Sequence, residues 1–110
     1  MFVASMSLRV RHNKRAEALS AFDQLMRQLR AWPGCLRCRL LADIDDDDAL
    51  NLTSEWRTRE ALDELLSSPE FLVLQGMRML LDREPQTVVD EVVVRATLDF
   101  NAPRAKAEGA

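Results

Sequence analysis

Residues 51–71 read NLTSEWRTREALDELLSSPEF, and this stretch decides the fold. Polar and apolar residues alternate up to Glu55 and Trp56, which is typical of a strand, and the spacing then changes to the period of a helix. Thr58 can cap that helix, and Ser68 followed by Pro69 supplies a second cap with proline at the first helical position. The stretch therefore predicts a strand over residues 49–57, a tight junction, and two successive helices that end near residue 82.

Trp56 stands at the junction between the strand and the first of these helices. Its ring offers a large apolar area and one N–H group that needs an acceptor when buried. Such a residue either packs two layers of a domain together or forms the wall of a small-molecule pocket. The residue type alone leaves both roles open.

The chain before this stretch predicts a strand, a helix and a second strand. Residues 2–10 alternate, and one face carries Phe2, Ala4, Met6, Leu8 and Val10. From Asn13, the expected N-cap, the spacing is helical until Pro33 and Gly34 end the helix. Residues 35–41 predict a strand that an acidic loop, residues 43–48, joins to the strand over residues 49–57 as a hairpin.

The chain after it predicts one last strand. Residues 87–100 are rich in valine and alternate, with the inward positions at Val92, Val94, Ala96, Leu98 and Phe100. Residues 101–110 lack an apolar period and predict a disordered tail. The order βαββαβ, with the second helix split, indicates one α+β domain of ferredoxin-like type over residues 1–100, with a four-stranded antiparallel sheet and both helices on one face.

The other face of that sheet has a mixed composition. Its expected apolar residues are Val3, Leu41, Val89 and Val93, and its expected polar residues are Ser5, Arg9, Arg37, Arg39, Thr53 and Glu55. A solvated sheet face fits this pattern. The polar interior of a barrel, in which Glu55 pairs with Arg37 or Arg39, fits it as well.

Composition excludes several classes of function. A length of 110 residues with 47% apolar residues is enough for one core. A formal net charge of -3 provides no basic surface, which argues against a nucleic-acid partner. No apolar run approaches a membrane span and no signal-peptide pattern is present, so we expect no membrane partner and a cytoplasmic protein.

Two apparent metal motifs are weak. Cys35 and Cys38 have the C-x-x-C spacing, but residues three apart on a regular strand point to opposite faces. The acidic loop around Asp45 lacks the glycine and the bidentate glutamate of an EF-hand, and a solvated hairpin loop is the simpler interpretation. The sequence therefore predicts no metal site, and it contains no nucleotide-binding or flavin-binding motif.

The best candidate pocket lies between the sheet and the helices. Strand parity places Ser54 and Trp56 on the same wall as Met6 and Leu8. Across from this wall, the restarted helix carries Phe71, Leu74, Gln75 and Arg78. These residues suit a flat aromatic ligand, although the same residues can simply fill the core.

Short motifs along most of the chain resemble the antibiotic biosynthesis monooxygenase (ABM) family. They are the turn Trp32-Pro33-Gly34-Cys35, the strand end Glu55-Trp56, and the Ser-Pro-x-Phe pattern that ends at Phe71. The resemblance spans about residues 2–100. It implies a homodimer in which two sheets pair face to face as a dimeric α/β barrel, and a monooxygenase that oxidises an aromatic or quinol-like molecule with dioxygen and without a cofactor.

The resemblance also implies roles for the pocket residues. Trp56 stacks on or bounds the substrate ring, with Met6, Leu8, Phe71 and Leu74 as apolar neighbours. Gln75, Ser54 or Arg78 binds the substrate oxygens, and His12, the only histidine, is the candidate general base, because imidazole is the side chain best suited to proton transfer near neutral pH. The chain has no tyrosine, so any tyrosine role in the family has no equivalent here.

Three other functions remain as alternatives. Haem-degrading relatives use a tryptophan and a phenylalanine that match Trp56 and Phe71, but Gln75 stands where they have the axial histidine, and Ser5, Met6 and Ser7 stand near their asparagine. A non-catalytic binding module of the same fold is a second alternative. An isomerase of small metabolites is the third, and it would need a more polar pocket.

Overall fold

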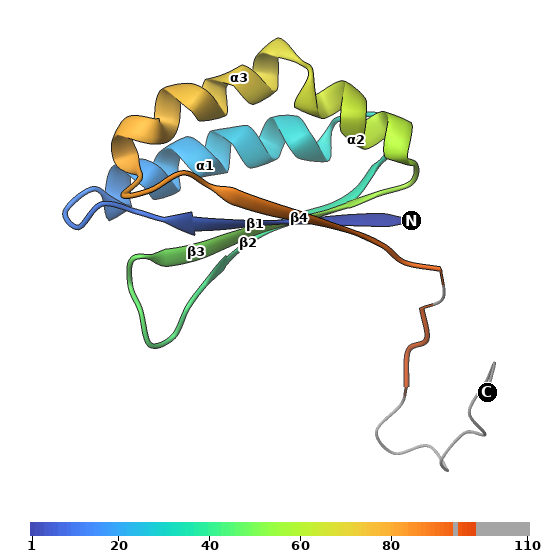
Figure 1. The fold of residues 1–110 in the computed structure, drawn as a ribbon, viewed down its shortest axis with the longest axis horizontal. Helices are drawn as coiled ribbons and strands as arrows, with labels where there is room; N and C mark the ends of the chain where they lie inside the picture. Colours follow the sequence, from blue (N-terminus) through green and yellow to red (C-terminus); the bar gives the residue numbers. More distant parts are fainter. Residues whose placement is uncertain (94, 99–110) are drawn as a thin grey trace.

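The computed structural model describes residues 1–93 and 95–98, without the side chains of residues 72–75. It has the predicted α+β, ferredoxin-like fold with a split second helix (Figure 1). The elements in chain order are β1 (Phe2–Arg9), α1 (Arg15–Arg30), β2 (Cys35–Ala42), β3 (Ala49–Trp56), α2 (Arg59–Leu66), α3 (Pro69–Gly76), the 3-10 helix η1 (Met77–Leu80) and β4 (Gln86–Glu91).

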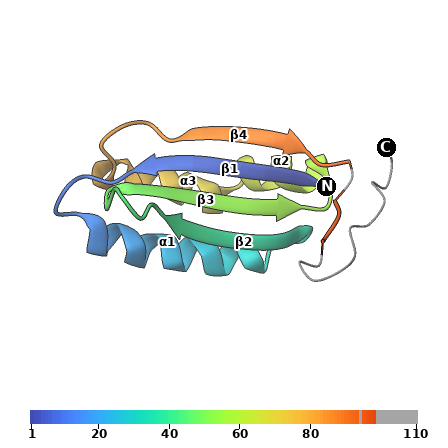
Figure 2. The ribbon, with the colours of Figure 1, turned by 90° about the horizontal axis from the view of Figure 1, so that it is seen from below.

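The four strands form one antiparallel sheet in the order β2-β3-β1-β4. The predicted hairpin is confirmed as the β2–β3 pair. All three α-helices lie over one face of the sheet, and Figures 1 and 2 show the opposite face without a covering layer. The sheet therefore has a helix-facing side and an open side.

The core fills the layer between the sheet and the helices, because the strands present alternate residues to that side. Its largest fully buried side chains are Trp56, Phe22, Leu62 and Val10.

Within the described residues, no helix is both long and apolar enough to cross a lipid bilayer.

Both caps predicted around α2 and α3 are confirmed. The Thr58 side chain accepts a hydrogen bond from the Ala61 N–H at 3.2 Å, and the Ser68 hydroxyl accepts one from the Phe71 N–H at 3.2 Å. The restarted helix is regular only to Gly76 and continues as η1. The break at Ser67 and Ser68 therefore separates two short helices, α2 and α3, which lie one after the other over the same face of the sheet.

The start of α1 differs from the prediction. Lys14, and not Asn13, is the N-cap residue, and its side chain makes no capping hydrogen bond. Asn13 instead adopts a φ of 75°, in the left-handed region that asparagine tolerates better than most residues. Asn13 therefore turns the chain between β1 and α1.

The last strand is shorter than predicted and has the opposite parity. β4 ends at Glu91, and the expected inward residues Ala96 and Leu98 are exposed. Val89 lies opposite Ala4 and packs on the core, whereas Val88 lies opposite Ser5 on the open side and is exposed. Valines occupy both parities of this segment, so pairing with β1 decides which of them face inward. The predictions for Val94, Phe100 and the tail at residues 101–110 lie outside the described residues.

β2 contains an irregularity that the sequence did not reveal. Cys35 pairs with Trp56, Arg37 with Glu55 and Cys38 with Ser54, so that Leu36 is an extra residue in the strand. A β-bulge of this kind shifts the side-chain alternation by one position. Cys35 and Cys38 consequently share the helix-facing side, and the prediction that they face opposite sides was wrong.

Gly34 connects α1 to β2 and permits a close approach between that turn and α2. Its φ is 87°, and a Cβ atom added there would lie 2.6 Å from the Cβ of Ala61 in α2. Its carbonyl oxygen also accepts a hydrogen bond from the Arg57 N–H at 2.8 Å. The glycine thus lets α2 begin directly beside the turn.

We predict that Gly34→Ala lowers the free energy of unfolding by about 1–3 kcal/mol, because alanine disfavours this φ and its methyl group collides with Ala61. The matched control is Gly76→Ala, since a Cβ atom there meets nothing within 4 Å. The control should be neutral or stabilising by up to about 1 kcal/mol. Urea denaturation measures both, and equal stability of the two variants would contradict this role of Gly34.

Candidate functional site

Trp56 lies at one end of the sheet, inside the layer between the sheet and the helices. It is the last residue of β3, is 0% exposed, and stands between Phe2 of β1 and Cys35 of β2 in the strand register. Its indole Nε1–H donates a hydrogen bond of 2.8 Å to the hydroxyl oxygen of Ser54. Ser54 is also buried, so the pair forms a polar contact inside an apolar environment.

The Ser54 hydroxyl has a defined orientation because of this contact. A hydroxyl has one hydrogen to donate and two lone pairs that accept. Trp56 uses one lone pair of Ser54 Oγ, so the hydrogen remains available for an acceptor in the same layer. This arrangement can present a fixed donor to a ligand oxygen.

Phe71 lies near the start of α3, above the same layer. Ser68 fixes that start, since its hydroxyl donates to the Leu65 carbonyl at 2.6 Å and accepts from the Phe71 N–H. The Phe71 side chain is partly buried and packs on the core. Leu74 and Gln75 follow on α3, but their side chains lie outside the described part of the chain.

Met6 and Leu8 lie on the helix-facing side of β1, as predicted, and both are buried. Met6 is opposite Leu52 and Leu8 is opposite Leu50 in the register with β3. At about 3.3 Å per residue, the six positions between Leu50 and Trp56 correspond to about 20 Å. The two residues therefore continue the wall away from Trp56.

The structure does not bring His12 and Arg78 to Trp56. The His12 side chain is 86% exposed, and its Nδ1 lies 3.6 Å from Oδ2 of Asp48 in the β2–β3 loop. Arg78 lies in η1 and forms an ion pair of 3.0 Å with Glu84. The Arg11 N–H donates to the Leu80 carbonyl, which places η1 at the end of β1 opposite Trp56.

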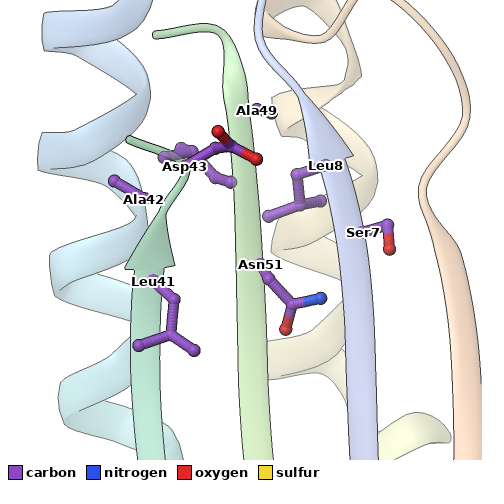
Figure 3. A pocket seen from close by; sticks show the side chains of 8 residues that line it. Ser7, Leu8, Leu41, Ala42, Asp43, Ala49 and Asn51 are labelled. Carbon is purple, nitrogen blue, oxygen red and sulfur yellow. The ribbon is translucent and has the colours of Figure 1, made fainter. Parts of the chain in front are cut away.

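A separate hollow of about 380 Å³ lies beside the β2–β3 hairpin. Figure 3 shows Leu41 of β2 and Asn51 of β3, which are register partners, beside Asp43 and Ser7. Asn51 accepts a hydrogen bond of 2.7 Å from the Thr53 hydroxyl. Asp43 accepts from the backbone N–H groups of the loop, including that of Asp45 at 2.8 Å. The polar side chains of Asp43 and Asn51, which line this hollow, thus form hydrogen bonds within the β2–β3 hairpin.

On the open side, the predicted pairing of Glu55 with Arg37 or Arg39 is not the one observed. Glu55 instead forms an ion pair of 2.9 Å with Arg95, from the segment after β4. Figure 1 shows that segment passing below the sheet, opposite the helices. The segment after β4 was predicted to continue the strand, so sequence reasoning had no reason to place Arg95 near Glu55.

Sequence reasoning also missed two groups near the Trp56 end. The indole Nε1–H of Trp32 is buried without a partner among the described residues. Burial raises the pKa of Cys38 to about 11, so its thiol is protonated at neutral pH.

Among the described residues, no three His, Cys, Asp or Glu side chains lie close enough together to hold a metal ion.

Sequence comparison identifies the family. The profile described as "Antibiotic biosynthesis monooxygenase" (ABM) matches residues 1–76, which is more than half of the chain. The chain belongs to the ABM family. A comparison with functionally curated proteins gave no match.

Solved structures agree with this ABM fold. A candidate antibiotic biosynthesis monooxygenase from Deinococcus radiodurans superposes with a TM-score of 0.83 at 15% identity, covering 90% of this chain and 99% of that one. Rv0793 from Mycobacterium tuberculosis gives 0.77 at 27% identity, covering 88% and 100%. A variant of SnoaB, a cofactor-independent oxygenase from Streptomyces nogalater, gives 0.76 at 22% identity, covering 86% and 94%.

We predict that Ser54→Ala lowers the free energy of unfolding of this ABM protein by about 1–3 kcal/mol, because it leaves the Trp56 N–H buried without an acceptor. In the Trp56→Phe background, which lacks that N–H, the same substitution should cost less. A double-mutant cycle by urea denaturation measures the difference, which we expect to be about 0.5–1.5 kcal/mol. Strictly additive effects would contradict the importance of the hydrogen bond.

Proposed function

We propose that this protein is a cofactor-independent monooxygenase that oxidises an aromatic or quinol-like small molecule with dioxygen. Membership of the ABM family supports an oxygenase, and SnoaB is a fold neighbour with that kind of activity in its name. The observation that carries the proposal is the buried hydrogen bond from Trp56 to Ser54, which leaves an oriented hydroxyl beside a large aromatic ring. A donor in an apolar site stabilises the negative charge that a phenolate carries on its oxygen.

The proposed site is the sheet–helix layer at the Trp56 end. Trp56 and Phe71 hold the flat ring, and Met6 and Leu74 extend the apolar wall. Leu8 lies about 20 Å from Trp56 at strand spacing, too far along β1 to touch the same ring. Ser54 donates its hydrogen to the substrate oxygen, and Gln75 provides a second polar group. Because Trp56 is fully buried, substrate entry requires the helices to move away from the sheet at this end.

The proposed chemistry relies on the substrate as the reductant. When a phenol reacts with one dioxygen to give a quinone and one water, it loses two hydrogen atoms, one from carbon and one from oxygen, and gains one oxygen atom. Together these changes are a four-electron oxidation of the substrate. The reactive species is the phenolate, so the protein must stabilise negative charge on oxygen in a site that excludes water. The Trp56–Ser54 chain of donors serves that purpose, since each donor polarises the next.

His12 and Arg78 are not part of the proposed site. Both lie at the opposite end of β1, about 20 Å or more from Trp56 at strand spacing. A phenol of low pKa can enter as its anion. We therefore expect turnover to rise with pH through the pKa of the substrate phenol.

We further propose that the protein is a homodimer in the cytoplasm, with residues 1–100 as its domain. The open sheet face exposes Val88 and Leu41 among polar residues, and a second sheet would cover them. The thiols of Cys35 and Cys38 are not joined in a disulfide, which is the usual state in the cytoplasm. Sedimentation equilibrium at micromolar concentration tests the dimer, and a mass of one chain would contradict it.

Dioxygen uptake by the metal-free protein with a panel of quinols and polyphenols tests the proposed activity. We predict uptake that produces one quinone and one water per dioxygen, and a loss of at least about tenfold in kcat/KM in Trp56→Phe and in Ser54→Ala. The matched control is Val10→Ala, which disturbs a fully buried residue at the far end of the sheet. No uptake with any substrate, or an equal loss in the control, would count against the proposal.

A further inference from the structure

One hydrogen-bond donor at the Trp56 end of the domain is buried without a partner among the described residues. It is the indole Nε1–H of Trp32, which follows the end of α1. An unpaired donor carries the full free-energy cost of its removal from water, because no hydrogen bond in the protein offsets that loss. Buried polar groups in folded proteins are almost always paired, so this N–H needs a functional explanation.

The Trp32 ring lies at the boundary between the core and the solvent. The backbone N–H of Trp32 donates to the Leu29 carbonyl at 3.1 Å, so the residue extends the last turn of α1. Its side chain is only partly buried and packs on the core, whereas its Nε1 atom is buried. The exposed part of the residue is therefore not the N–H. The donor edge of the ring faces the protein interior.

Backbone hydrogen bonds join the Trp32 turn to the end of β3 that carries Trp56. The Cys35 N–H donates to the Trp32 carbonyl at 3.0 Å, and Cys35 is the register partner of Trp56. The Gly34 carbonyl accepts from the Arg57 N–H, one residue beyond Trp56. Figure 1 shows the end of α1 and the start of α2 at this same end of the sheet. Both tryptophans therefore lie at one end of the sheet–helix layer.

The two indole N–H groups differ in what they bind. The N–H of Trp56 is used by Ser54, whose own hydroxyl hydrogen remains for a ligand. The N–H of Trp32 is not used by any described residue. An indole N–H can only donate, so its partner must be an acceptor such as an ether, carbonyl or hydroxyl oxygen. Because Ser54 lies on β3 and Trp32 on the turn after α1, the two donors can hold two separate oxygens of one ligand.

We propose that the Trp32 N–H donates to a second oxygen of the substrate, and that the site therefore selects aromatic rings with oxygen at two separate positions. This inference rests on the proposed oxygenase site, in which Ser54 remains the donor to the oxygen that ionises. A substrate with a second acceptor oxygen pairs the buried N–H of Trp32. A substrate without one leaves it unpaired, and such a mismatch is a strong source of discrimination.

The test compares ligands of nearly equal shape that differ in one ether oxygen. The ligands are 4-methoxy-1-naphthol with 4-ethyl-1-naphthol, and the corresponding 5-substituted pair. The ¹⁵N-labelled protein is titrated with each under argon, and the indole resonances of its two tryptophans are followed. We predict that every ligand shifts the Trp56 resonance saturably. In at least one pair, the methoxy compound should move the Trp32 N–H proton downfield, which its ethyl analogue should not do, and should bind about three- to tenfold more tightly.

Trp32→Phe keeps an aromatic ring and removes the N–H, so it should bind the methoxy and ethyl compounds equally. The matched control is Trp56→Phe, which removes the other indole N–H. It should weaken the binding of both compounds and keep the preference for the methoxy compound. The titration of the unaltered protein decides the question even if a variant folds poorly.

The outcomes separate this inference from the proposed oxygenase site. A shift of Trp56 with no preference for either methoxy compound would overturn the inference alone, and would assign the Trp32 N–H to a bound water. A preference that survives in Trp32→Phe would also overturn the inference alone. A Trp56 resonance that no ligand shifts would overturn both the proposed site and the role of Trp32.

Discussion

The structure depends on the complete burial of Trp56 at the point where β3 ends and α2 begins. A tryptophan at this position must find an acceptor for its N–H and must be covered by helices. Ser54, two residues earlier on the same side of β3, supplies the acceptor at 2.8 Å. Gly34 lets α2 start close enough to supply the cover, since any larger residue would meet Ala61. Sheet, turn and helix are thereby joined at one end of the domain.

The same constraint organises the proposed chemistry. Because the indole N–H is already used by Ser54, the pair presents one oriented hydroxyl instead of two independent donors. An apolar layer around a single donor suits a flat phenolate, whose charge is concentrated on oxygen. His12 and Arg78, which looked suitable by residue type, lie at the other end of β1. The fold therefore keeps these two side chains away from the aromatic residues Trp56 and Phe71.

Local patterns in the sequence were sufficient for most of the fold. The caps at Thr58 and Ser68, and the alternation of β1 and β3, each depend on neighbouring residues alone. The predictions that failed depend on pairing between distant segments. Register with β1 turned Val89 inward, and the bulge at Leu36 placed both cysteines on one side. For the site, parity correctly put Ser54 and Trp56 on the helix-facing side, but the hydrogen bond between them depends on side-chain conformations that no local pattern predicts.

The central claim is that an aromatic ligand binds in the layer between the sheet and the helices. Its most direct test follows the indole N–H resonance of Trp56 while the protein is titrated with 1-naphthol without oxygen, with Trp32→Phe used to assign the signal. We predict a saturable shift of the Trp56 resonance and little change at Ser5 and Thr53 on the open face. An unchanged Trp56 resonance together with shifts at those open-face residues would contradict the account.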